Sequence, residues 1–233
     1  MKVTNNNKIT IATIKSWNIE KAKKLISDNP QLKIQLITNK DELTYENVDK
    51  FKPRYVFFPH WSWIIPKEIY NNFECVVFHM TDLPFGRGGS PLQNLIIRGL
   101  TETKISAIRV VKDIDAGPIY LKHDLDLQGS ATEIFIRLSE IVFGKMIPYI
   151  LNESPEPIPQ QGDSVIFKRR TPDQSNISSI RDISKIYDYI RMLDAEGYPP
   201  AFVETSQLRI EFFKGKLDNG YVLAQAKIKV KNE

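Results

Sequence analysis

The feature that most constrains the fold is the alternation of short apolar runs with helical segments in the first half of the chain. Residues 8–14 (KITIATI) and 32–38 (LKIQLIT) predict strands, and residues 16–26 between them carry apolar side chains at helical spacing. Residues 55–59 (YVFFP) and 75–79 (CVVFH) are almost free of charge and rich in β-branched and aromatic residues, which is typical of central strands. Repeated strand–helix–strand units predict a doubly wound, mostly parallel, Rossmann-like α/β sheet.

Two later helices have sequence signals for their first turn. Ser90, Pro91 and Gln93 have the order of an N-cap, a first-turn proline and a capping-box partner. Ser130 and Glu133 repeat the capping-box spacing. We therefore expect one helix to begin after Ser90 and a longer one after Ser130.

A proline-rich run marks the expected domain boundary. Residues 152–161 read NESPEPIPQQ, a composition typical of a linker. The prediction is a catalytic domain over residues 1–151, a linker over 152–163 and a small C-terminal α+β domain over 164–233.

The small domain is expected to contain two strands, residues 208–213 and 221–230, joined by a turn at Asn219-Gly220. Alternate residues of the last strand are apolar and share one face. That face either closes the small domain or joins two copies of the chain in a homodimer.

The rare residues exclude several kinds of site. The chain has one cysteine, Cys75, so an intrachain disulfide or a cysteine-based zinc site is impossible, and we expect no metal. The first glycine is Gly86, so no dinucleotide or Walker loop precedes it. A net charge of +4 suits an anionic small molecule and is too weak to predict nucleic-acid binding. No long apolar segment is present, so the expectation is a soluble, cytoplasmic protein without a membrane partner.

A histidine and an aspartate follow strands of the expected sheet. His79 ends the run 75–79 and precedes a glycine-rich loop, and Asp115 lies in the turn after a second strand. Ligands of open α/β sheets bind beyond the carboxyl ends of the strands. A histidine paired with a carboxylate can accept a proton from a nucleophile near neutral pH. The alternative is a structural histidine and an aspartate that only shapes its turn.

These two loops resemble those of the folate-dependent formyltransferase family, which includes methionyl-tRNA, glycinamide ribonucleotide and sugar N-formyltransferases. Residues 79–91 read HMTDLPFGRGGSP and residues 113–119 read DIDAGPI, against a family pattern of H-x-S-x-L-P-x-x-R-G-x-x-P followed by D-x-G-x-I. The resemblance extends over about residues 8–213. The matching residues are His79, Leu83, Pro84, Arg87, Gly88, Pro91, Asp115, Gly117 and Ile119.

The resemblance implies transfer of a formyl group from N10-formyltetrahydrofolate to a primary amine. His79 would assist proton removal from the amine, and Asp115 would orient that histidine. The family's oxyanion-stabilising asparagine, two positions before the histidine, is replaced by Val77. Loss of one such donor costs about 2.7–4 kcal/mol of transition-state stabilisation. The nearest candidate substitutes in sequence are Thr81, Gln93 and Asn94.

The resemblance also implies contacts to both ligands. The segment before the histidine strand and the aspartate loop would hold the pterin, largely through backbone atoms, and the alternative is that the tryptophans there are core residues. The residues expected to contact the cofactor are Trp63, Ile65, Ile69 and Asp113, and those expected to contact the substrate are Thr81 and Arg87.

The expected acceptor is the amine of a nucleotide-linked amino sugar. This expectation rests on the two loops and on the short tail after the linker. Two alternatives are a methionyl-tRNA formyltransferase-like enzyme and, because of Val77, a non-catalytic homologue that binds folate or a sugar nucleotide.

Overall fold

A computed structural model of the chain describes residues 7–231, which divide into two compact units. The first unit includes the described residues up to 87 and residues 104–125 and 136–166. The second includes residues 88–103 and 126–135 and the described residues from 167 onward. The domain boundary at the proline-rich run stays a prediction.

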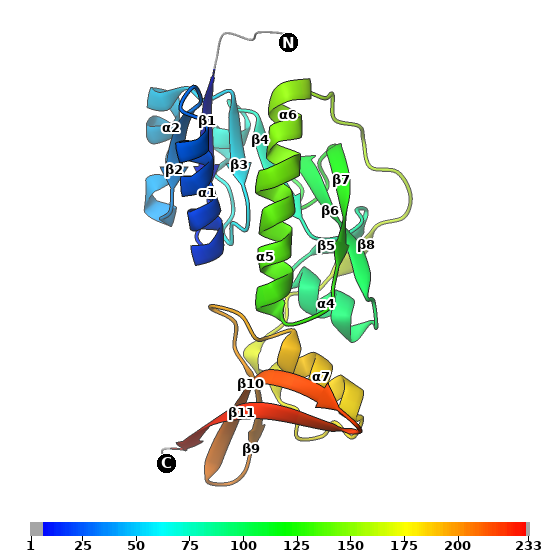
Figure 1. Ribbon diagram of the computed structural model, residues 1–233. Helices are drawn as coiled ribbons and strands as arrows, with labels where there is room; N and C mark the ends of the chain where they lie inside the picture. The colour runs from blue at the N-terminus through cyan, green and yellow to red at the C-terminus, as the bar shows by residue number, and fades with distance from the viewer. Residues whose placement is uncertain (1–6, 232–233) are drawn as a thin grey trace. The chain divides into compact units, whose positions relative to one another are not determined.

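A six-stranded sheet forms the centre of the first unit, with the strand order β2-β1-β3-β4-β6-β7 (Figure 1). The neighbours β1/β2, β1/β3 and β3/β4 are parallel, and β6 is antiparallel to β4. This arrangement confirms the predicted mostly parallel α/β sheet. The strands are β1 (Lys8–Ala12), β2 (Lys33–Ile37), β3 (Tyr55–Phe58), β4 (Cys75–His79), β6 (Glu102–Arg109) and β7 (Ile119–Asp126).

The central strands are buried because helices cover the sheet. All four residues of β3 are buried, as its uncharged sequence predicts. Figure 1 shows α1 and the α5–α6 helix crossing the face of the sheet that is turned to the viewer. The helices are α1 (Ser16–Asp28), α2 (Tyr45–Phe51), α3 (Lys67–Tyr70), α5 (Ala131–Ile141) and α6 (Ile147–Glu153), and a π-helical turn, Val142–Met146, joins the last two.

The second unit contains a three-stranded antiparallel sheet of order β11-β10-β9, packed with helix α7. This sheet confirms the expected antiparallel appendage. The strand β9 was not predicted, because it has only four residues and directly follows two prolines. The elements are α4 (Pro91–Ile97), α7 (Ile183–Arg191), β9 (Ala201–Glu204), β10 (Leu208–Asp218) and β11 (Tyr221–Val230), and a separate two-stranded sheet pairs β5 (Phe85–Gly88) with β8 (Val165–Phe167).

One of the two predicted capping boxes is wrong. Ser90 has a left-handed φ of 50°, and its hydroxyl accepts a hydrogen bond from the backbone N–H of Arg170 instead of capping α4. Gln93 is buried and donates to a main-chain carbonyl outside the helix. The other box is confirmed, because the backbone N–H of Ser130 donates to Glu133 Oε2 (2.7 Å) and that of Glu133 donates to Ser130 Oγ (3.3 Å).

Candidate active site

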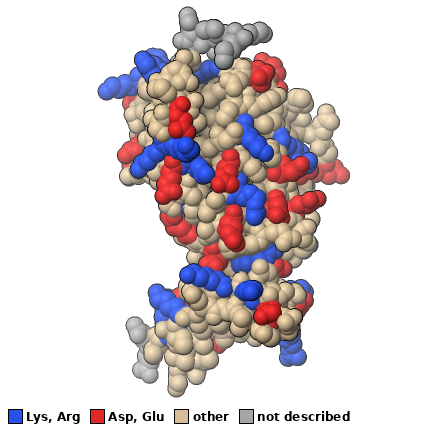
Figure 2. Space-filling model, viewed as in Figure 1, with Lys and Arg blue, Asp and Glu red and all other residues tan. Residues whose placement is uncertain are grey.

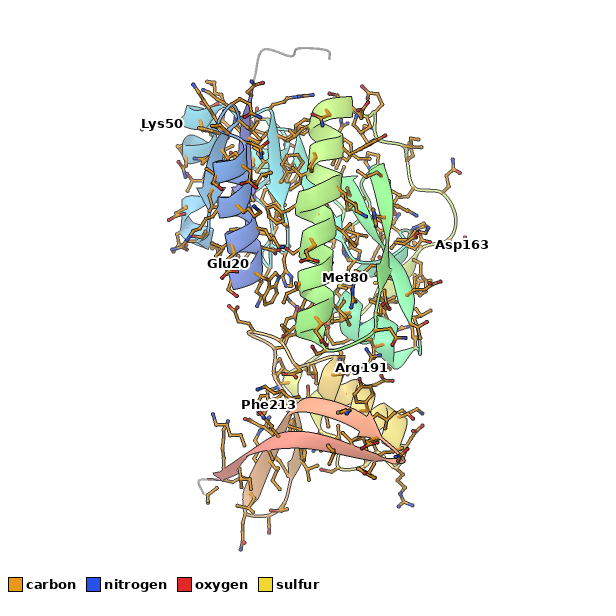
Figure 3. The ribbon with its side chains drawn as sticks, viewed as in Figure 1. Glu20, Lys50, Met80, Asp163, Arg191 and Phe213 are labelled. Carbon is orange, nitrogen blue, oxygen red and sulfur yellow. The ribbon has the colours of Figure 1, made fainter. Side chains whose placement is uncertain are left out.

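His79 is the last residue of β4, and its ring orientation is set by the loop that follows. The side chain is 9% exposed, and its Nε2 lies 2.8 Å from the carbonyl oxygen of Gly86. A carbonyl oxygen only accepts hydrogen bonds, so Nε2 carries the proton in this contact. The neutral ring then presents Nδ1 as its basic atom. In Figure 3 the label of Met80 marks the next residue of the chain.

Asp115 faces the basic nitrogen of His79. Its Oδ2 lies 3.5 Å from His79 Nδ1, and its side chain is 15% exposed. The two residues are 36 positions apart in the sequence. Because β6 runs antiparallel to β4, with Arg109 opposite Val76, the loop after β6 turns back toward the His79 end of β4 and brings Asp115 to the ring. A proton accepted at Nδ1 would create a positive ring next to a carboxylate, which stabilises the charged form.

The turn that holds Asp115 has little conformational freedom. Asp115 has a φ of 53°, which is uncommon for a residue other than glycine. A Cβ added to Gly117 would lie 1.7 Å from the carbonyl oxygen of Arg109, so only glycine fits at that position. The family-like D-x-G spacing therefore has a steric cause in this chain.

Thr81, expected to contact the substrate, is completely buried. Its hydroxyl donates toward the carbonyl oxygen of Gly86 (3.4 Å), the same atom that orients His79. Its own carbonyl accepts a hydrogen bond from Ser106 Oγ at 2.7 Å. Thr81 thus holds the loop after β4 in place and has no surface to offer a substrate in this conformation.

Arg87, the other expected substrate residue, contacts a residue that we assigned to the linker. Its Nε and Nη2 both donate to Gln160 Oε1, at 3.0 and 2.7 Å. The Gln160 amide in turn donates to the carbonyls of Asp115 and Gly117. The sequence analysis did not single out Gln160, because its proline-rich surroundings are typical of a linker and not of a functional site.

The three candidates for the missing oxyanion donor are all engaged elsewhere. Thr81 is directed at Gly86, and Gln93 Nε2 donates to the carbonyl of Met192. Asn94 Nδ2 shares its two hydrogens among three main-chain carbonyls at 3.0–3.1 Å, those of Gly89, Ser90 and Lys168. Val77 itself packs against the apolar core cluster of the first unit. No side chain among these takes the place of the family asparagine.

The expected cofactor residues divide into accessible and buried ones. Trp63 is 39% exposed and Asp113 is exposed, so both can meet a ligand. Ile65 is 9% exposed and lies in the core cluster. Ile69 is completely buried in the same cluster, and its carbonyl accepts a hydrogen bond from the N–H of Phe73. Ile69 therefore supports the core and is not placed to bind a cofactor.

The tryptophan before this segment has an unused donor. Trp61 packs its ring edge-on against Trp63, with 5.0 Å between ring centroids. Its Nε1 is buried without a hydrogen-bond partner among the described residues. A buried donor of this kind is unusual, because most buried N–H groups are paired.

The other two histidines have structural surroundings. Burial, with the charge of Lys15 as a smaller cause, lowers the pKa of His60 to about 4, so this ring stays neutral at pH 7. The ring of His123 accepts a hydrogen bond from Lys145 Nζ.

Within residues 7–231 we find no group of three or more acidic, histidine or cysteine side chains arranged to hold a metal ion. No helix in that range has the length and apolar character needed to span a bilayer.

Comparison with known proteins places the chain in a family. A solved structure described as methionyl-tRNA formyltransferase from Clostridium thermocellum superposes with a TM-score of 0.95 and 56% identity, over 96% of this chain and 99% of that one. The chain belongs to the folate-dependent formyltransferase family. Residues 172–229 also match the family model described as the C-terminal domain of methionyl-tRNA formyltransferase.

Two more distant formyltransferases match this chain over a smaller share of their length or at low sequence identity. Methionyl-tRNA formyltransferase from Bacillus cytotoxicus is 30% identical over 173 residues, which cover 71% of this chain and 54% of that protein. The chain thus spans about half the length of the curated relatives it matches. A sugar N-formyltransferase from Shewanella sp. FDAARGOS_354 superposes with a TM-score of 0.65 at 13% identity, over 94% of this chain and 96% of that one. At that identity the likeness concerns the fold alone.

Proposed function

We propose that the protein transfers a formyl group from N10-formyltetrahydrofolate to a primary amine. The observation that carries the proposal is the position of His79 between the Gly86 carbonyl and the Asp115 carboxylate, at the carboxyl end of β4. This edge of an open α/β sheet is where ligands bind. Family membership supports the same reaction.

In this proposal His79 removes the proton that the amine loses. An attacking amine must give up a proton as its new C–N bond forms and the C–N10 bond of the donor breaks. Nδ1, which carries no proton when Nε2 donates to Gly86, is the ring nitrogen that would accept this proton, and N10 gains a proton as tetrahydrofolate leaves. The Gly86 carbonyl keeps the ring from rotating, and Asp115 stabilises the ring once it is charged. General base assistance of this kind contributes about 10²–10⁴-fold to a rate.

The formyl donor would lie against the segment around Trp63, with Asp113 on the second loop and Ile65 contributing at most part of its surface. When bound, it supplies an activated formyl carbon whose oxygen gains negative charge during the reaction. The exposed Trp63 ring is the feature of this chain that fits its heterocycle.

Val77 stands where the family has the asparagine that stabilises the formyl oxygen, and this leads to a prediction. Val77→Asn is expected to raise kcat for formyl transfer by about 10-fold or more, because one oxyanion donor is worth about 10²–10³-fold. Steady-state kinetics measure the effect, and Val77→Leu is a control that adds volume at this position without a hydrogen-bond donor. An unchanged or lower kcat in a folded Val77→Asn protein would mean that another group already serves the formyl oxygen.

For the acceptor we propose the amine of a nucleotide-linked amino sugar. We expected the short tail after the linker to favour a sugar acceptor. Chain length does not support this choice, because the alignment with the solved methionyl-tRNA formyltransferase structure covers nearly all of both chains. The charge distribution does support it. On the face shown in Figure 2, basic and acidic side chains are interspersed. RNA binding depends on cations that are free to neutralise phosphates.

The sheet of the second unit has several of its cations neutralised. Arg209 pairs with Glu204 and Glu211, Lys229 pairs with Glu211, and Lys231 pairs with Glu204. Hydrogen bonds from Arg209 and Lys231 hold the pKa of Glu204 below its usual value, so this carboxylate stays charged at neutral pH. These five residues together carry a net charge of only +1.

Methionyl-tRNA is the second candidate, favoured by the family match of residues 172–229. The two acceptors are separated by measuring kcat/KM with methionyl-tRNA and with a panel of nucleotide-linked amino sugars under the same conditions. We expect at least one sugar to exceed methionyl-tRNA. The reverse order would contradict the sugar proposal and leave the formyl transfer itself in place.

We further propose a homodimer through β11. The predicted apolar face of this strand does not close the small domain, because Ile228 and Val230 are 64% and 73% exposed and, of that face, only Val222 is partly covered. Sedimentation equilibrium is expected to give twice the chain mass of 26.9 kDa, and Ile228→Lys the monomer mass. A monomer for the unaltered chain at all concentrations would contradict this proposal.

A further inference from the structure

Gln160 uses every hydrogen-bonding position of its side-chain amide. Its Oε1 accepts from Nε and Nη2 of Arg87 at 3.0 and 2.7 Å, and its Nε2 donates to the carbonyls of Asp115 and Gly117, both at 2.8 Å. A carboxamide has two acceptor positions and two donor hydrogens. All four are satisfied, so the orientation of the amide is determined by its partners.

These contacts connect the two loops of the candidate active site. Arg87 directly follows Gly86, whose carbonyl orients His79. The Gln160 amide holds the Asp115 turn from its backbone side and leaves the carboxylate directed at His79. One side chain therefore joins the loop that orients the histidine to the turn that presents the carboxylate.

The segment that carries Gln160 is itself fixed to the sheet. Two residues before it, Ile158 exchanges two backbone hydrogen bonds of 2.8 Å with Ile119 at the start of β7. The proline-rich run is therefore anchored where it passes the site. Gln161, the next residue, is exposed.

Only glutamine satisfies these partners. A glutamate at this position would still accept from Arg87 but would place a carboxylate oxygen against two carbonyl oxygens, with no hydrogen to share. A leucine would leave the Asp115 and Gly117 carbonyls and the Arg87 donors without these bonds. Asp115, with its left-handed φ of 53°, depends on such outside contacts because the conformation is unfavourable for a residue with a side chain.

We infer that Gln160 is a positioning residue that sets the distance between the Asp115 carboxylate and His79 Nδ1. The inference rests on the proposed formyl transfer. Gln160 acts through Asp115 and does not itself touch the reacting groups. A displacement of about 1 Å in a catalytic group can cost about 10²-fold in rate.

A double-mutant cycle tests whether Gln160 acts through Asp115. Gln160→Leu is expected to lower kcat by about 10–100-fold with little change in KM for the formyl donor. In an Asp115→Asn background, which keeps the backbone carbonyl and removes the charge, the same substitution is expected to cost about twofold or less. Gln161→Leu is the matched control and should leave both values unchanged. An equal loss in both backgrounds would overturn the inference, because a merely structural role is additive.

Gln160→Glu is the second variant, since it keeps the size of the side chain and the Arg87 contact. It is expected to reproduce the loss of kcat seen with Gln160→Leu, and a circular dichroism spectrum like that of the unaltered chain shows that the variant is folded. Unaltered kcat in this variant would show that the two carbonyl contacts do not position the site.

A further readout is independent of any activity. Amide hydrogen exchange in residues 113–118 is expected to be at least about 10-fold faster in Gln160→Leu than in the unaltered chain or in Gln161→Leu, because the turn loses its outside support. Equal exchange would overturn the inference. If the unaltered chain transfers no formyl group, the proposed function fails, and hydrogen exchange still decides whether Gln160 holds the turn.

Discussion

Replacing His79 by alanine is expected to lower kcat/KM for formyl transfer by about 10²–10⁴-fold, the usual contribution of a general base. The alanine has no atom that can accept the amine proton. The ring also makes the Gly86 contact, so part of the loss reflects a looser loop after β4. Initial-rate measurements with a defined formyl donor and acceptor give the value.

His123→Ala is the matched control, because His123 lies on β7 and takes no part in the proposed chemistry. Its kcat/KM is expected to stay close to that of the unaltered enzyme. Affinity for tetrahydrofolate, measured by titration calorimetry, is expected to be retained in both variants. If His79→Ala were active at a near-normal rate, the assignment of His79 as the proton acceptor would be wrong.

Asp115→Asn has the second large expected effect. Asparagine has nearly the size of aspartate but no charge, so it cannot stabilise a protonated His79 ring across the 3.5 Å contact. We expect kcat to fall by about 10²–10⁴-fold, as for loss of the base itself, because the base then works without its counter-charge.

Asp113→Asn, two positions earlier in the same turn, is the control for Asp115→Asn. Asp113 is exposed, and its proposed contact to the formyl donor concerns binding, so its substitution should change KM for the donor more than kcat. An Asp115→Asn enzyme with normal kcat would show that the carboxylate has no part in the reaction. Comparing kcat and KM of these two variants shows whether the charge at Asp115 itself is needed, or whether any loss of a carboxylate from this turn has the same effect.

The sheet and the two site loops were predictable because their causes are local. The runs at 55–59 and 75–79 are apolar enough that only a covered strand accommodates them, and the structure buries all of β3. His79 was placed at the end of one predicted strand and Asp115 in the loop after another. Their contact depends on the antiparallel pairing of β4 and β6 and on the return of the loop after β6, which the sequence pattern does not show. Gly117 was named only because it matches the family pattern, and the structure supplies the reason, since the Arg109 carbonyl leaves no space for a side chain.

The contacts that cross between distant segments were not predictable in this way. Ser90 has the signature of an N-cap, yet the backbone of Arg170, 80 residues later, takes its hydroxyl. Thr81 stands where the family pattern has a serine, and its side chain is buried and supports the loop. The residues around Gln160 have the composition of a linker. The inferred role of Gln160 comes from its hydrogen bonds to the Asp115 and Gly117 carbonyls, which the sequence does not show. Hydrogen bonds over such separations leave no periodicity in the sequence.

The most direct test of formyl transfer is a single-turnover experiment with the full chain. Enzyme in excess over N10-formyltetrahydrofolate is mixed with each nucleotide-linked amino sugar and with methionyl-tRNA, and the formylated product is followed by mass spectrometry. The account predicts one equivalent of formylated amine and one of tetrahydrofolate with at least one sugar. Intact binding of the folate with no transfer to any acceptor would contradict it.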